Sequence, residues 1–245
     1  RYWLRGKPLG SSAMSRKSSQ GDYTTKRFGI AVLSAASLLA AGTAAAAEPQ
    51  WNYGQIGWIQ GDGFEDGGES DGFKMDGSIG FLENYHAQLA YRDGEIDSFG
   101  TEVDFDGYDL TAGFHQAVSS SGNTQVFFDI KYFDLSYDED GAEGSFDDTG
   151  YGLGFGLRSM ISDNVELQGM ITWVQGEIDG DSGYFSSDDE DYTDSNLSVG
   201  GRWHWTSNIS TGLTLNINGS SASSYSSGDS ALFDVRYSFG SDISK

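Results

Sequence analysis

The sequence contains no cysteine, only two prolines and few basic residues among its 245 positions. Without cysteine the chain can form neither disulfides nor thiolate metal sites, which excludes a disulfide-rich scaffold and a cysteine zinc site. Fourteen lysines and arginines against 37 aspartates and glutamates give a net charge of -23, which excludes a protein that binds nucleic acid by neutralising phosphates. An aromatic content of 14% is too high for a disordered acidic tail, so we expect a folded chain.

The few basic residues are unevenly distributed. Seven of the 14 precede residue 28, whereas the chain from Glu48 onward carries seven basic and 36 acidic residues. Lys26 and Arg27 are followed by an apolar run and then by small residues that end at Ala47, an order typical of a secretory signal peptide. We therefore predict that residues 1–47 are an N-terminal extension and signal peptide, cleaved after Ala47, and that residues 48–245 form one domain.

After residue 47 there is no apolar run long enough for a transmembrane helix, but alternation of apolar and polar residues recurs about ten times. In the last such segment, Phe233, Val235 and Tyr237 alternate with Asp234 and Arg236. Segments of roughly 10 alternating residues match tilted membrane strands. The expected fold is all-β, a transmembrane antiparallel up-and-down barrel of ten strands, with eight as the alternative. The expected strands are 51–61, 72–81, 85–92, 105–116, 124–136, 149–160, 164–175, 194–205, 208–218 and 230–239.

The connections between these strands alternate in length. Short ones have the chemistry of tight turns, and the longer ones are acidic or rich in serine. This rhythm is typical of an outer-membrane barrel with short periplasmic turns and longer extracellular loops. The short connections are 82–84, 117–123, 161–163 and 206–207, and the longer ones are 62–71, 93–104, 137–148, 176–193 and 219–229.

A secreted β-sandwich would also alternate, and the position of the charged residues favours the membrane barrel. Six of the seven basic residues after Glu48 fall on the polar faces of strands, several among acids, whereas the loops hold almost none. A buried charge is tolerated only when it is paired and hydrogen-bonded, so we expect a charge network inside a narrow lumen. The expected network is Lys74, Asp76, Arg92, Asp109, Asp129, Lys131, Arg158, Glu166, Arg202, Asp234 and Arg236.

Aromatic residues on the apolar faces form two groups, as the two interfaces of a membrane select. One group stands next to the short turns and the other toward the long loops. The first is Phe81, Tyr85, Phe114, Trp203 and Trp205, and the second is Phe73, Phe105, Tyr132, Tyr151 and Trp173.

The small residues that end at Ala47, the alternating strands and the final segment 231–239 resemble the small outer-membrane β-barrel proteins of Gram-negative bacteria, the porin-like domain family. The resemblance implies a place in the outer membrane, among its lipids and lipopolysaccharide. It also implies that the barrel assembly machinery reads the terminal aromatic pattern of Phe233, Tyr237 and Phe239. The chain departs from the pattern by continuing beyond Phe239 to Lys245.

The chemistry-bearing residues do not indicate an enzyme or a cofactor. We expect His86, His115 and His204 beside short turns on the lumen face, where hydrogen bonding is favoured over a shared metal site. Acidic loop residues offer oxygen ligands for Ca²⁺ or Mg²⁺, but none has EF-hand spacing, so diffuse cation binding is favoured. The weak candidates for a defined site are Asp138, Asp140, Asp188, Asp189 and Asp191.

The sequence thus favours a non-enzymatic integral outer-membrane barrel with a structural or surface-interaction role through acidic extracellular loops and a ligand that is not specified. The alternative is a narrow passive channel for small cations or solutes, and a surface hydrolase is a weaker third. The lumen face of segment 149–160 is lined by glycine, which either makes room for bulky neighbours such as Phe127 and Phe133 or leaves a solute path.

Overall fold

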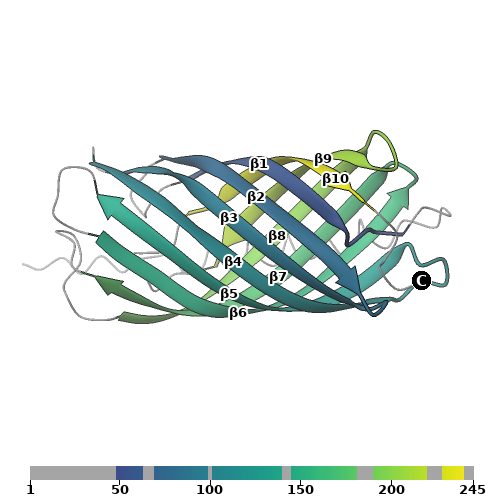
Figure 1. Ribbon diagram of the computed structural model, residues 1–245, viewed down its shortest axis with the longest axis horizontal. Helices are drawn as coiled ribbons and strands as arrows, with labels where there is room; N and C mark the ends of the chain where they lie inside the picture. The colour runs from purple at the N-terminus through teal and green to yellow at the C-terminus, as the bar shows by residue number, and fades with distance from the viewer. Residues whose placement is uncertain are drawn as a thin grey trace, which may run out of the picture.

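The computed structural model describes residues 48–62, 69–98, 101–139, 145–180, 190–219 and 228–239. Ten antiparallel strands close into one barrel, in which the first strand pairs with the last (Figure 1). No helix in these ranges is long and apolar enough to cross a membrane. The strands are β1 (Tyr53–Asp62), β2 (Glu69–Phe81), β3 (Tyr85–Ser98), β4 (Thr101–Ala117), β5 (Thr124–Glu139), β6 (Ser145–Ser162), β7 (Val165–Gly180), β8 (Glu190–His204), β9 (Ile209–Asn218) and β10 (Ser230–Ser238).

The all-β barrel of ten strands is confirmed, and the eight-strand alternative is wrong. We call one end of the barrel the turn end, because residues 82–84, 118–123, 163–164 and 205–208 connect strands there, and the opposite end the loop end. β1 begins and β10 finishes at the turn end. At the loop end the strands run further than expected: β3 reaches Ser98 and β4 starts at Thr101. The acidic residues at these ends of β3 and β4 keep the strand pairing, and they alternate with side chains that face the lumen.

The outer face of the barrel is apolar, which is the reverse of a soluble protein. On β6, for example, Leu153 and Phe155 are exposed, whereas the intervening Gly152 and Gly154 are buried. Exposed tryptophans such as Trp58 and Trp173 lie on the same outer surface. This arrangement supports the membrane barrel and is inconsistent with a soluble sandwich, whose apolar face would be inside.

Two glycines of the β6 wall lie against phenylalanine rings of the neighbouring strand. A Cβ at Gly156 would overlap the ring of Phe127, and one at Gly150 would lie 2.6 Å from the ring of Phe133. Both phenylalanines are buried. Gly150 and Gly156 therefore accommodate bulky neighbours, as one of the two sequence interpretations held, whereas Gly154 borders a cavity.

One face assignment and one expected strand start are wrong. Phe105 lines the lumen instead of the outer surface, because its neighbour Tyr108 faces outward three residues along the strand. Trp51 lies before β1, and its ring is buried inside the barrel. On β1, which pairs with both β2 and β10, Ile56 and Trp58 face outward. The residues that alternate with them face the lumen.

Candidate lumen site

The lumen is narrowed at the turn end by the indole of Trp51, which is 6% exposed. The indole stacks on His86 at 4.0 Å and on His115 at 4.6 Å between ring centroids. Its Nε1 donates a hydrogen bond of 2.8 Å to Oε1 of Gln125. The guanidinium of Arg158 lies 4.5 Å from the indole ring, in the range of a cation–π contact. The segment that precedes β1 therefore packs inside the barrel.

Ion pairs surround the Trp51 indole and its stacking partners. Arg158 Nη2 lies 2.7 Å from Oε1 of Glu166, whose other oxygen lies 3.2 Å from Nε2 of His204. His86 contacts Asp129 at 3.0 Å through Nε2, and its Nδ1 lies 3.4 Å from Nδ1 of His115. His204 thus binds a different partner from the other two histidines, so the three do not form a common metal site.

A second ion pair joins β8 to β10. Arg202 Nη2 lies 2.6 Å from Oδ1 of Asp234, and both side chains are buried. Gln55 on β1 accepts hydrogen bonds from Arg236 Nε at 2.8 Å and from Arg202 at 3.3 Å. Arg236 also lies 3.7 Å from the ring of Tyr53. These contacts cross the β1–β10 pairing from the inside.

Midway along the lumen, three basic side chains gather around one carboxylate. Asp109 pairs with Arg92 and, at 3.1 Å, with Lys131 Nζ. Lys74 stands directly opposite Arg92 in the pairing of β2 with β3, and among the described residues it has no ion pair within 4 Å. Asp76 accepts a hydrogen bond of 2.9 Å from Gln88. Like charges directly opposite each other on a sheet are destabilising, so Lys74 and Arg92 repel each other.

Toward the loop end, β8 and β9 present uncharged amides and hydroxyls to the lumen. Ser198 Oγ donates to Oδ1 of Asn216 at 2.7 Å, or to Oδ1 of Asn196 at 3.0 Å. Asn216 Nδ2 donates to Ser230 Oγ at 3.2 Å. Asn196 also bonds to Asn218. The ladder fixes the orientation of these groups across three strands.

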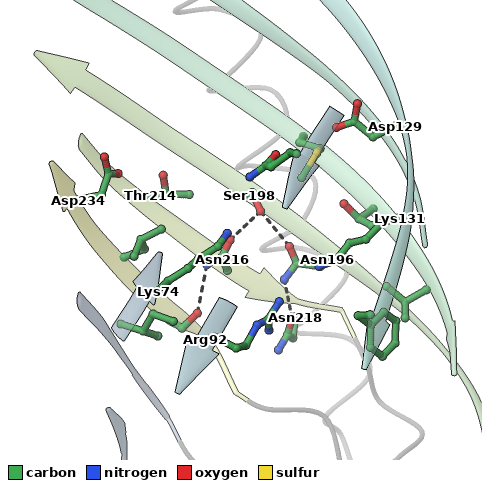
Figure 2. Close-up of a pocket in the computed structure, with 18 of the residues that line it drawn as sticks. Lys74, Arg92, Asp129, Lys131, Asn196, Ser198, Thr214, Asn216, Asn218 and Asp234 are labelled. Atoms are coloured by element: carbon green, nitrogen blue, oxygen red, sulfur yellow. Dashed lines mark hydrogen bonds between the residues drawn. The ribbon is translucent and has the colours of Figure 1, made fainter. Parts of the chain in front are cut away.

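A cavity of about 440 Å³ lies between the basic cluster and the amide ladder. Figure 2 shows Lys74, Arg92 and Lys131 around the same cavity as Asn196 and Asn216. Its lining reaches Trp51 at the turn end but does not include His86, which lies behind that ring. The volume is in the range of small-molecule sites, roughly 300–1,000 Å³.

The expected network residues all have inward or buried positions. The structure brings most of them into the pairs described above, namely Arg92 and Lys131 with Asp109, Arg158 with Glu166, and Arg202 with Asp234. Asp129 contacts His86, Asp76 contacts Gln88, Arg236 contacts Gln55, and Lys74 lines the cavity.

Of the weak cation candidates, Asp138 and Asp191 are exposed side chains at the loop end, and Asp140, Asp188 and Asp189 lie outside the described residues. Sequence reasoning missed three exposed carboxylates with ligand atoms within 4.8 Å of one another, those of Glu95, Glu102 and Asp104. These groups lie nearer the loop end than the aromatic residues of the outer surface. Like-charge repulsion, from Glu102 first and then from Asp71, raises the pKa of Glu95. Crowded exposed acids of this kind are common without a bound ion.

The remaining candidates are the terminal aromatic residues. Phe233 and Tyr237 project outward from β10, and Phe239 is exposed just beyond it. Trp51 and the amide ladder were not expected as parts of a site. The ladder had a signal in the sequence, since Asn216 and Asn218 alternate with Leu215 and Ile217 without any charge. Trp51 had none, because it precedes the strand whose alternation would have placed it.

Comparison with solved structures finds other membrane barrels at low identity. The translocator domain of the autotransporter NalP from Neisseria meningitidis is 13% identical, with a TM-score of 0.53 over 88% of this chain and 96% of that one. The NanC porin is 9% identical, with a TM-score of 0.42 over 77% and 100%. Ail, the attachment invasion locus protein of Yersinia pestis, is 15% identical, with a TM-score of 0.34 over 79% and 100%. No family model and no curated protein sequence matches.

The likeness to the NalP translocator domain shows the fold. The apolar outer surface of the barrel is suited to contact with the lipid of a membrane. The chain has the fold of an outer-membrane β-barrel, a closed antiparallel barrel with an apolar outer surface.

Proposed function

We propose that the chain is a non-catalytic barrel that admits small polar solutes into its lumen, with Trp51 as the constriction. The turn end then faces the periplasm and the loop end faces outward. The observation that carries the proposal is the continuous cavity of about 440 Å³, whose lining extends from residues near the loop end, such as Asn218, to the indole of Trp51. A lumen filled by side chains throughout would have left no such space.

The charge of the lining favours anions over cations. Six basic side chains but only four carboxylates line the cavity. The sequence alone suggested a channel for small cations, because it showed an acidic chain; the acids at the loop end point mostly outward, away from the lumen. We therefore propose a preference for anionic or neutral polar solutes.

The non-catalytic part of the proposal rests on the histidines. His86 is held by Asp129 and His115, and His204 by Glu166. An activated nucleophile needs a base within hydrogen-bond reach, and in the described part of the chain no serine or threonine hydroxyl is hydrogen-bonded to these rings.

Conductance in planar bilayers tests the path. The wild-type barrel is expected to show small anion-selective steps, and Trp51→Ala is expected to enlarge them because the indole no longer narrows the lumen. Trp58→Ala is the matched control, since that indole lies on the outer surface and is 53% exposed. Absence of steps from both the wild type and Trp51→Ala would reject the solute path.

A structural or surface-interaction role is the second candidate, favoured by a ring of exposed acids at the loop end. We call this ring the acidic collar. It consists of Glu95, Asp97, Glu102, Asp104, Asp106, Asp138, Asp147, Glu177, Asp179 and Asp191, on strands β3 to β8. Divalent cations held by the collar would link the barrel to the phosphates of surrounding lipopolysaccharide.

A further inference from the structure

We infer that the lumen holds a binding site for a monocarboxylated, hydroxyl-rich small molecule, a sugar acid, between the basic cluster of Lys74, Arg92 and Lys131 and the amide ladder of β8 and β9. This inference deepens the proposed function and rests on its cavity, because it names the class of solute that the cavity takes. The argument uses the charge of one wall, the hydrogen-bonding groups of the other and the space between them.

The basic wall turns three cationic side chains toward the cavity, and the carboxylates of Asp129 and Asp148 line the cavity as well. Lys74, Arg92 and Lys131 all line the cavity, whereas Asp109, the partner of two of them, is 4% exposed and does not. Lys74 and Arg92 are direct neighbours across β2 and β3. A carboxylate between them would relieve the repulsion of these like charges.

Arg92 gives an independent sign that an acceptor is lacking. Its Nη2 is bound to Asp109, but its Nε is buried and has no hydrogen-bond partner among the described residues. A buried donor without a partner costs free energy of about 1–3 kcal/mol. An anionic ligand in the adjoining cavity could supply the missing acceptor.

The opposite wall is suited to hydroxyl groups. Asn196, Ser198 and Asn216 line the cavity and are held by one another. Primary amides both donate and accept hydrogen bonds, as does a hydroxyl, so vicinal hydroxyls of a sugar ring match this wall. Asp194, two residues from Asn196 on β8, also lines the cavity, so a second anionic group would meet a carboxylate there.

The sum of nearby charges selects a monoanion over a dianion such as phosphate. The three cations face Asp109, and Asp76 and Asp129 lie two residues from Lys74 and Lys131 on the same strands. A single carboxylate can accept hydrogen bonds from Lys74 and from Arg92 Nε, which has no partner among the described residues, whereas a doubly charged group would be repelled more strongly by these three carboxylates.

Isothermal titration of the refolded full chain in detergent micelles tests the site. D-glucuronate is expected to bind saturably, whereas D-glucose, acetate and inorganic phosphate bind at least tenfold more weakly. Glucose lacks the carboxylate and acetate lacks the hydroxyls, so both walls are examined. Equal affinity for acetate and glucuronate, tighter binding of phosphate, or no saturable binding of glucuronate would overturn the inference.

Substitutions locate the site. Lys74→Met removes a cavity cation without breaking an ion pair, and Asn216→Ala shortens the amide ladder; each is expected to weaken glucuronate binding at least tenfold. Asn164→Ala, in an exposed turn between β6 and β7, is the control and is expected to bind normally. Heat-modifiable migration in electrophoresis checks that each variant folds. If a variant does not fold, the selectivity of the wild type among the four ligands tests the inference. Unchanged affinity in folded Lys74→Met and Asn216→Ala would overturn the placement.

The outcome is separable from that of the proposed solute path. Glucuronate binding without conductance would reject the path and leave the site, whereas conductance without glucuronate binding would leave the path and reject the site.

Discussion

Close contacts inside the barrel depend on residues that have no side chain. A Cβ at Gly212 would lie 2.8 Å from both Arg202 Nη2 and Asp234 Oδ2, so the glycine opens the space in which this ion pair forms. One at Gly113 would overlap the contact between His86 and Asp129. The glycines of the lumen thus position the charges as much as the charged residues do.

Gly156→Val is expected to lower the free energy of unfolding by about 1–3 kcal/mol, the usual cost of overpacking. The reason is that the new side chain overlaps the ring of Phe127. Urea unfolding in micelles, followed by tryptophan fluorescence, measures the change. Gly54→Val is the control, because a Cβ at Gly54 meets nothing within 4 Å. Equal stability of the two variants would contradict the packing account.

Arg202→Met is expected to lower the free energy of unfolding by about 3–5 kcal/mol, because it leaves a buried carboxylate without its partner. Asp234 is only 1% exposed. The double variant Arg202→Met with Asp234→Asn is expected to regain part of the loss, since the charge is then gone. Equilibrium unfolding of the single and double variants checks this, and no recovery in the double variant would speak against the pair.

At the residue level, the sequence is informative wherever a side chain lies inside a regular strand. Alternation placed Arg158 and Glu166 on the lumen face, and charge balance suggested that such residues pair. Alternation cannot place a residue outside a strand. For this reason Trp51 was assigned to the first strand and not to the narrow part of the lumen. The prediction from alternation also depends on the residue from which the period is counted. Phe105 was placed on the outer face, although it faces the lumen.

At the level of elements, the strands and their pairing order follow from the period of the sequence, but their ends do not. Hydrophobic contrast fades where β3 and β4 leave the apolar layer, although their backbone hydrogen bonds continue to Ser98 and from Thr101. The pairing of backbone groups requires no apolar side chain. Strand ends at the loop end were therefore placed too early.

The terminal strand provides a test of the expected assembly signal. Phe239→Ala is expected to reduce the amount of barrel recovered from outer membranes several-fold, because the terminal aromatic pattern would no longer be recognised. Phe128→Ala is the control, since both phenylalanines are 44% exposed and only one lies in the terminal segment. Quantitative blotting of membrane fractions measures both. A similar yield from the two variants would show that Phe239 acts as an ordinary lipid-facing residue.

At the scale of the whole molecule, the described basic residues and the acidic collar lie on opposite faces of the barrel wall. The basic residues lie inside the barrel, and the collar lies on its outer surface. In the described part of the chain, the excess of acids over bases therefore lies mainly on the outside of the barrel. A surface of this sign beside phosphorylated lipids is stable only when cations intervene.

Mg²⁺ is accordingly expected to raise the melting temperature of the barrel by a few degrees in vesicles that contain lipopolysaccharide, and by less in phosphatidylcholine vesicles. The triple variant Glu95→Gln, Glu102→Gln and Asp104→Asn is expected to show a smaller shift, because part of the collar is neutral. Calorimetric scans at matched ionic strength measure the difference. An equal shift for the wild type in both lipids would rule out a bridging role for the collar.

The side chain of Gln55 gives the closure of the barrel a further meaning. It stands on β1 and receives hydrogen bonds from Arg236 on β10 and Arg202 on β8, so the first and last strands are tied by side chains as well as by backbone. Parting the wall at this joint would expose the buried pair of Arg202 and Asp234 to lipid. A lateral gate is thus disfavoured, and molecules that reach the lumen must travel along the barrel axis.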